Sequence, residues 1–149
     1  MVVGIKLQKH PHNIFIGSLV QFLYLFTYSQ SKTMEYVCDF SFLFDVDGKR
    51  MMKGASVVPI YVNAVGHWIT SPPYPFRQLN LQLRRKNNKE TLQQHHLHWN
   101  YGETPIDELQ DHLVQLLFDS TRIFLHGQVK VDIMKKLLPN HDNIIDLPH

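Results

Sequence analysis

The stretch TPIDELQDHLVQLLFDSTRIFLHGQVKVDIMKKLLPNHDNIIDL, residues 104–147, alternates helical with extended patterns. Thr104 is suited to cap a helix, and Pro105 fits the first turn, where its missing N–H costs nothing. The two acids that follow complement the helix dipole. An apolar stripe at helical spacing then ends near Asp119, and its members are Leu109, Leu113, Leu116 and Leu117. These signals predict a helix from about residue 104 to residue 119.

The rest of this stretch predicts three further elements. Residues 122–125 form a short apolar run typical of a buried strand, and residues 144–146 form another. Between them, residues 129–138 have helical periodicity, and Pro139 ends the helix. The side chains expected to face inward on this helix are Val129, Ile133, Met134 and Leu137.

A hairpin precedes the alternating stretch. Residues 36–44 are apolar and aromatic with polar residues at alternate positions, and the segment Asp45-Val46-Asp47-Gly48 favours a tight turn. The partner strand is predicted from Lys49 to about Val58, because Pro59 cannot donate to a ladder. A hairpin followed by helix, strand, helix and strand predicts an α/β fold whose later strands run parallel through crossover helices.

Composition places few limits on function. The chain has 149 residues, enough for one domain, and its 15 basic and 13 acidic residues give a formal net charge of +2. This balance does not indicate a nucleic-acid or membrane partner. Ten histidines predict stronger anion binding below about pH 6.5. The single cysteine, Cys38, excludes an internal disulfide, which fits an intracellular protein of the nucleus or cytoplasm.

The N-terminal 33 residues differ from the remainder and are predicted to be an apolar extension of a domain spanning residues 34–149. Basic residues precede an apolar run from Ile14 to Phe26, as in a secretory signal, so a secreted or membrane-attached protein is the alternative. The run is shorter than the ~20 apolar residues that span a bilayer, and a membrane is therefore not the expected partner. An added strand or helix packed on the domain is the other interpretation.

From about Glu35 onward the chain resembles a group of poorly characterised RNase H-like proteins from invertebrate genomes, of suspected mobile-element origin. The matching pieces, in order, are Asp45-Val46-Asp47-Gly48, Pro72-Pro73-Tyr74-Pro75-Phe76, residues 96–102 (HLHWNYG), Pro105 with Leu109, residues 123–127 (IFLHG) with Lys130, and Ile144-Ile145-Asp146-Leu147. The resemblance implies an RNase H-like mixed sheet similar to that of the DEDD exonucleases. It also implies that the chain ends before the last helix of that fold.

The exonuclease pattern is incomplete in this chain. Such an enzyme holds two divalent ions about 4 Å apart with several carboxylates, the first two from an Asp-x-Glu on the first strand. Residues 1–33, where that strand is expected, contain no Asp or Glu. Only residues 126–132 resemble the middle motif, and the spacing is one residue longer. The resemblance therefore implies a catalytically incomplete domain with an interaction role and no cofactor.

The alternative is a nuclease that uses Mg²⁺ or Mn²⁺ in a reduced catalytic site of Asp39, Asp132 and Asp146. Asp39 lies within an otherwise apolar strand, where an ionised carboxylate is costly unless it is paired or faces solvent. Asp146 ends the last strand, where α/β sheets commonly bind ligands. Asp45 and Asp47 are interpreted instead as turn residues.

Weak binding of single-stranded nucleic acid is the leading hypothesis for the interaction, and a protein partner is also considered. The predicted contacts are Arg84, Arg85, Lys86 and Lys89 with phosphates, and Trp99 and Tyr101 as stacking faces. The other interpretation of this charge run is a solvated helix face or loop.

His96 and His98 are candidate zinc ligands, because a His-x-His pair on a strand presents both imidazoles on one face. A third ligand would come from His67, Glu90 or Glu103. The alternative is a polar loop that packs Trp99 against the domain.

Overall fold

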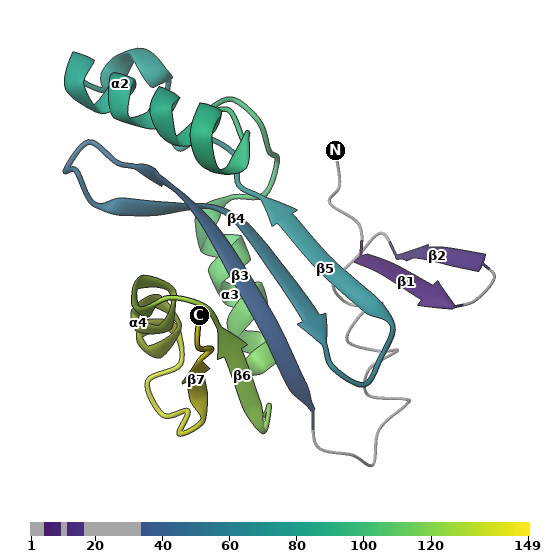
Figure 1. Cartoon of the computed structure of the whole chain (residues 1–149). Helices are drawn as coiled ribbons and strands as arrows, with labels where there is room; N and C mark the ends of the chain where they lie inside the picture. The colour runs from purple at the N-terminus through teal and green to yellow at the C-terminus, as the bar shows by residue number, and fades with distance from the viewer. Residues whose placement is uncertain (1–4, 10–11, 17–33) are drawn as a thin grey trace.

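The structure is a computed structural model that describes residues 5–9, 12–16 and 34–149. Seven strands form a sheet in the order β2-β1-β5-β4-β3-β6-β7, and helices accompany it (Figure 1). The α/β class is therefore confirmed. The strands are β1 (Ile5–Lys9), β2 (His12–Ile16), β3 (Glu35–Phe44), β4 (Arg50–Pro59), β5 (Ala64–Ile69), β6 (Arg122–Leu125) and β7 (Ile144–Asp146). The helical elements are η1 (Phe76–Gln78), α2 (Leu81–Glu90), the π-helix η2 (Thr91–His95), α3 (Ile106–Leu117) and α4 (Gln128–Leu137).

β3 is an interior strand of the sheet. It pairs antiparallel with β4 on one side and parallel with β6 on the other, and β6 pairs parallel with β7. The predicted hairpin and the predicted parallel strands are therefore confirmed, and the bounds predicted for β6 and β7 are those observed. Gly48 completes the β3–β4 turn at φ +76°, a conformation that favours glycine.

The main core lies between the sheet and two helices, α3 and α4. Alternate residues of β3, including Tyr36, Cys38 and Phe40, point toward these helices because side chains alternate along a strand. Helix α3 contributes the leucine stripe at positions 109, 113, 116 and 117, as predicted. On α4 the prediction is partly wrong, because Val129 is exposed, whereas Val131 and Met134 are buried.

A second, smaller core joins the far half of the β3–β4 hairpin to α2 and to the loop after η2. Its members are Leu43, Phe44, Met51, Leu79, Leu83 and Trp99. Between the two cores, the register passes from the pair Ser41–Gly54 to the pair Phe42–Met52, which leaves Lys53 as the extra residue of a β-bulge. A bulge bends and twists a hairpin, and here the bent half meets α2 (Figure 1).

Lys53 is buried at this bulge, with 1% of its surface exposed. Its Nζ donates to the carbonyl oxygens of Thr70 at 2.9 Å, Trp99 at 2.8 Å and Tyr101 at 2.5 Å. An ammonium has three N–H groups, so each finds an acceptor. The side chain thereby fixes the loop after η2 to the end of β5. Gly102 is required beside it, because φ is +101° and a Cβ would clash with the Thr70 carbonyl oxygen.

The start of α3 differs from the prediction. Pro105 holds the N-cap position, not the first turn, and no side chain caps the helix. Thr104 forms an isolated bridge with Thr70 instead. The loop after η2 draws Thr104 into this extended pairing, so the residue is not available as a cap.

The described part of the N-terminal segment adds two strands to the sheet. β1 and β2 form a hairpin at one edge of the sheet, where β1 pairs with β5. The expectation that residues 1–33 hold the first strand of an RNase H-like sheet stays a prediction. Residues 17–33, with most of the apolar run, lie outside the described residues. In the part of the chain that the structure describes, no helix has the length and apolar character to cross a bilayer.

Candidate functional site

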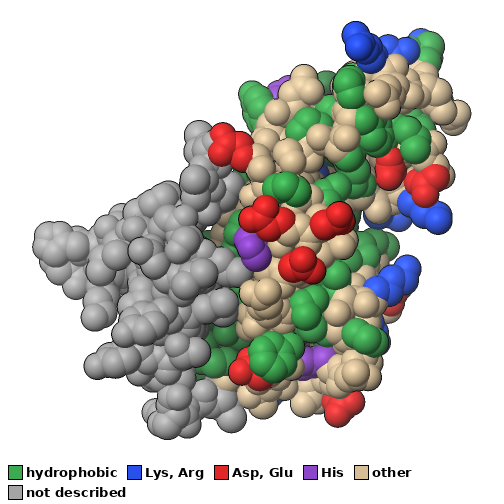
Figure 2. Space-filling view, turned by 180° about the vertical axis from the view of Figure 1, so that it is seen from behind, with side chains coloured by type: hydrophobic (Ala, Val, Ile, Leu, Met, Phe, Trp, Pro, Cys, Tyr) green, Lys and Arg blue, Asp and Glu red, His purple; other side chains and the backbone are tan. Residues whose placement is uncertain are grey.

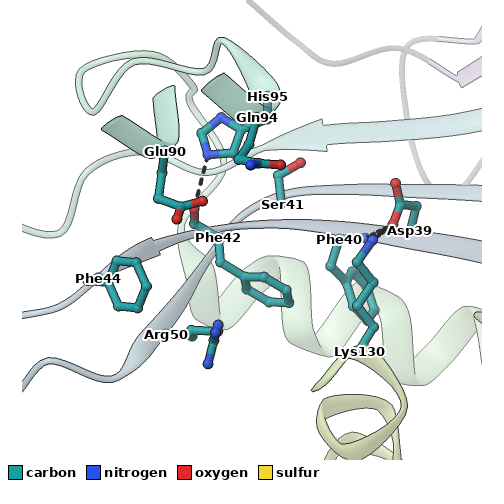
Figure 3. A pocket seen from close by; sticks show the side chains of 10 residues that line it. All are labelled: Asp39, Phe40, Ser41, Phe42, Phe44, Arg50, Glu90, Gln94, His95 and Lys130. Atoms are coloured by element: carbon teal, nitrogen blue, oxygen red, sulfur yellow. Dashed lines mark hydrogen bonds and ion pairs between the residues drawn. The ribbon is translucent and has the colours of Figure 1, made fainter. Parts of the chain in front are cut away.

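The edge of β3 that faces β6 is open along most of its length. β6 pairs only with residues 35–37, so beyond Val37 no described strand adjoins this edge. A groove of about 340 Å³ lies there, between the hairpin, the α2–η2 segment and α4 (Figure 3). The groove is lined by Asp39, Phe40, Ser41, Phe42, Phe44, Arg50, Glu90, Gln94, His95 and Lys130.

Side chains from α2 and η2 make hydrogen bonds to backbone N–H and C=O groups of β3 at the hairpin end of this edge. The Asn87 amide accepts from the Phe44 N–H at 2.6 Å and donates to the Phe44 carbonyl at 2.9 Å. The His95 Nε2 lies 3.0 Å from the Phe42 carbonyl, while its Nδ1 accepts from the Leu97 N–H at 3.0 Å. The imidazole is therefore the Nε2–H tautomer, with Nε2 donating to Phe42.

Asp39 and Lys130 form an ion pair at the other end of the groove (Figure 3). The Asp39 Oδ1 also accepts from the Phe40 N–H at 3.0 Å. The Asp39 side chain is 66% exposed and the Lys130 side chain 27% exposed. An ionised carboxylate in an apolar strand needs either solvent or a partner of opposite charge, and Asp39 has both.

Four polar side chains of the groove make no hydrogen bond and no ion pair within the described part of the chain. They are the Ser41 hydroxyl, the Arg50 guanidinium, the Glu90 carboxylate and the Gln94 amide. In Figure 3, Glu90 and Gln94 lie on one side of the β3 strand, and the Phe42 ring and Arg50 lie on the other. The groove therefore offers unused donors and acceptors on both sides of an open strand edge.

Basic side chains lie on α2, whose last residue Glu90 lines the groove, and on the β3–β4 hairpin. We call this set the basic end; it comprises Lys49, Arg50, Arg84, Arg85, Lys86 and Lys89. The Lys86 Nζ lies 3.7 Å from the centre of the Phe44 ring, and the Arg50 guanidinium carbon lies 5.6 Å from it. Among the described residues, only Lys49 of this set has a carboxylate partner, Asp47 at 3.6 Å. Acidic side chains gather elsewhere, over α3 (Figure 2).

The three aspartates predicted to be catalytic do not form one site. The Asp132 Oδ1 accepts from the Gln128 amide at 2.7 Å on the exposed side of α4. The Asp146 Oδ1 accepts from the Gly127 N–H at 2.8 Å. Within residues 34–149, no three His, Cys, Asp or Glu side chains lie close enough together to hold a metal ion. The predicted convergence with Asp39 is therefore wrong.

The two histidines predicted as zinc ligands do not lie on a strand. η2 ends at His96, which has a left-handed conformation with φ of 59°, and His98 follows in the loop. The His98 ring packs edge-on against Tyr101 at a centroid distance of 5.0 Å. The alternation of side chains on which the His-x-His prediction depends is therefore absent here.

The prediction that Trp99 is a stacking face is wrong. The ring is 6% exposed, its Nε1 donates to the Tyr74 carbonyl at 3.0 Å, and it packs against Tyr74 and Phe76. The alternative, a loop that packs Trp99 against the domain, is confirmed. Tyr101 is 54% exposed, and its role as a stacking face stays a prediction.

Arg50 and Gln94 are groove residues for which the sequence carries no signal, because nothing local places them beside β3. Lys130 belongs to one of the matching motifs, but its partner Asp39 is 91 residues away. Comparison of the chain with family models, with curated proteins and with solved structures gave no match. Its function is therefore inferred from the geometry of its own residues.

Proposed function

We propose that this protein is a catalytically incomplete α/β domain that binds single-stranded nucleic acid at its basic end. The observation that carries the proposal is the concentration of cations on α2 and the hairpin, which lack carboxylate partners among the described residues except for Lys49. Unpaired cations on one end of a nearly neutral domain create a local positive potential. Phosphates would neutralise it and release their counterions on binding.

A single strand fits this end better than a duplex. Tyr101 is exposed on the loop after η2, which Lys53 fixes to the sheet, and its ring offers a face to an unstacked base. The Phe42 ring is half-buried in the groove beside the basic end. Aromatic faces next to a phosphate-binding surface are typical of proteins that bind single strands without strong sequence preference.

We further propose an RNase H-like arrangement of the sheet. The support for it is the antiparallel β3–β4 hairpin followed by the parallel strands β6 and β7, with α3 and α4 as connections. β3 would then be the first strand of the pattern, with Asp39 at the position of its first carboxylate. Ser41 stands where the pattern has Glu, and Lys130 is paired with Asp39. One carboxylate already bound to an ammonium is a poor ligand for two divalent ions.

Fluorescence anisotropy with labelled DNA and RNA strands of about 20 nucleotides tests this proposal. We expect binding at low salt, with an affinity that falls steeply as the salt concentration increases. When Arg84, Arg85, Lys86 and Lys89 are all replaced by Gln, several phosphate contacts are lost, so both the affinity and its salt dependence should decrease. The matched control replaces Lys135 and Lys136, exposed on α4, by Gln and should bind like the wild type. No binding at low salt, or equal binding by both variants, would contradict the proposal.

The same strands, incubated with the protein and Mg²⁺ or Mn²⁺, should remain intact. Cleavage that depends on Asp39 would show a working metal site and would overturn the catalytically incomplete interpretation.

A further inference from the structure

We propose that the groove on the open edge of β3 takes one base of the bound strand, and that Glu90 and Gln94 select cytosine or adenine, which carry an amino group where uracil and thymine carry the carbonyl O4. This inference rests on the proposed function, because the basic end supplies the phosphate contacts beside the groove. It adds a binding site for a base and a preference among the bases, neither of which phosphate contacts alone provide.

The groove fits a compact ligand and not an added peptide strand. The Phe42 carbonyl and both backbone groups of Phe44 are already bonded to His95 and Asn87, which ends the free edge at the hairpin. Lys130 closes the other end by its pair with Asp39, whose Oδ1 also occupies the Phe40 N–H. Only a short piece of backbone is left, too little for the ladder of main-chain bonds that strand addition needs.

The unused groups of the groove match a planar ligand with both donors and acceptors. On one side of the strand edge Gln94 offers an amide, Ser41 a hydroxyl and Glu90 a carboxylate. On the other side the Phe42 ring offers an apolar surface. The volume of about 340 Å³ is at the lower end of the range for small-molecule sites, which suits one nucleotide. Arg50 lines the groove and also belongs to the basic end, so a base in the groove would have its phosphate beside cations.

Glu90 gives the groove its chemical preference. An ionised carboxylate only accepts hydrogen bonds, so it favours the amino groups of cytosine and adenine and repels the carbonyl O4 of uracil or thymine. The Gln94 amide, which both donates and accepts, complements the adjacent acceptor on the same edge of the base. Asp39 does not oppose a phosphate, because Lys130 neutralises it. Cytosine and adenine should therefore bind in preference to uracil and thymine.

Two measurements on the full chain test the inference. In the first, CMP, AMP and UMP are titrated into ¹⁵N-labelled protein. We expect CMP and AMP to shift the amide signals of Ser41 and Gln94, and UMP to leave them unchanged. In the second, anisotropy compares strands of dC or dA with dT, each of about 20 nucleotides, where we expect a preference of about tenfold against dT.

Three variants make the test specific. Glu90→Gln should reduce the preference against dT, because the new amide can donate to O4, whereas a merely structural role of Glu90 would weaken all strands alike. Gln94→Ala should also reduce the preference, and Gln93→Ala, an exposed neighbour outside the groove, should leave it unchanged.

The outcomes separate this inference from the proposed function. The wild type could bind dC, dA and dT equally, and the variant with Gln at the four α2 cations could bind none of them. That result would leave the proposed function intact and overturn the inference. The inference also fails if UMP shifts the groove signals as CMP does, or if no mononucleotide shifts them. If none of the strands binds but CMP shifts Ser41 and Gln94, the proposed function fails and the groove stands as a mononucleotide site.

Discussion

The two cores of this domain are held together by different means. Between the sheet and α3 with α4, the buried side chains are largely apolar and meet through helical and strand periodicity. At the α2 end, the smaller core is accompanied by buried and half-buried polar side chains that bond to backbone groups. Lys53 binds three carbonyls, Asn87 satisfies Phe44, and His95 donates to Phe42.

The difference follows from the backbone in each region. The main core is built from regular elements whose backbone groups satisfy one another. The α2 end contains a bulge, an open strand edge and an irregular loop, so its buried carbonyls need partners from side chains. The candidate groove lies in this second region, where unpaired backbone and polar side chains already meet.

Replacing Leu113 by Ala should give the largest loss, about 2–5 kcal/mol of unfolding free energy, because it leaves a cavity in the main core. Leu113 is almost fully buried on α3, whereas Gln115 on the same helix is exposed and its Ala variant should lose less than about 0.5 kcal/mol. Urea unfolding followed by circular dichroism measures both. Similar midpoints for the two variants would contradict the assignment of this core.

Replacing Asn87 by Ala should cost about 2–3 kcal/mol, because it leaves the N–H and carbonyl of Phe44 buried without partners. Asn88, its exposed neighbour on α2, provides the control. If both Ala variants unfold at the same urea concentration, the polar anchoring of the α2 end is not a source of stability. Hydrogen exchange of the Phe44 amide should accelerate only in the Asn87 variant.

A pH series distinguishes the buried Lys53 from a surface lysine. Burial lowers the pKa of Lys53 from 10.5 to about 8, so above pH 8 the folded chain releases this proton before the unfolded chain does. The unfolded state then binds more protons, so the contribution of Lys53 to stability should rise with pH by about 1–2 kcal/mol between about pH 8 and 9.5. Denaturant unfolding from about pH 7.5 upward measures the rise.

Cys38 opposes this rise at higher pH. Burial, reinforced by the nearby Asp39 charge, raises the pKa of its thiol from 9.0 to about 12, so the unfolded chain loses this proton first. The contribution of Cys38 to stability therefore falls above pH 9 and offsets the rise from Lys53 there, so that the total levels off. In a Cys38→Ala variant the rise should therefore continue toward about pH 10. A stability that is flat from about pH 7.5 to 9 in both proteins would contradict the role given to Lys53.

Replacing Lys49 by Ala should have the smallest effect on stability, less than about 0.5 kcal/mol. Its pair with Asp47 is on the surface, where the two side chains are 84% and 48% exposed. The same change should reduce the slope of nucleic-acid affinity against salt by about one. A large loss of stability would show that the hairpin end depends on this pair, unlike other exposed pairs.

Local pattern is sufficient for most of the secondary structure. The leucine stripe of α3, the turn at Gly48 and the bounds of β6 and β7 all follow from the spacing of apolar and turn residues. The failures occur where a tertiary contact overrides that pattern. Thr104 bridges Thr70 and does not cap α3, and Trp99 fills the second core and does not face solvent.

The candidate site is less accessible to sequence reasoning. Asp39 stands out in the sequence because a carboxylate in an apolar strand needs a partner, but the pattern suggests other aspartates with a metal as that partner. The partner is Lys130 instead. Lys130 and Asp39 are 91 residues apart, so no local spacing in the sequence predicts the pair. The β3–β4 hairpin and the order from α3 to β7 were thus determined by the sequence alone, because hydrophobic periodicity is a local property. The groove was decided only by the tertiary structure, because its walls depend on strand pairing, on the bulge at Lys53 and on where α2 and α4 meet the open edge of β3.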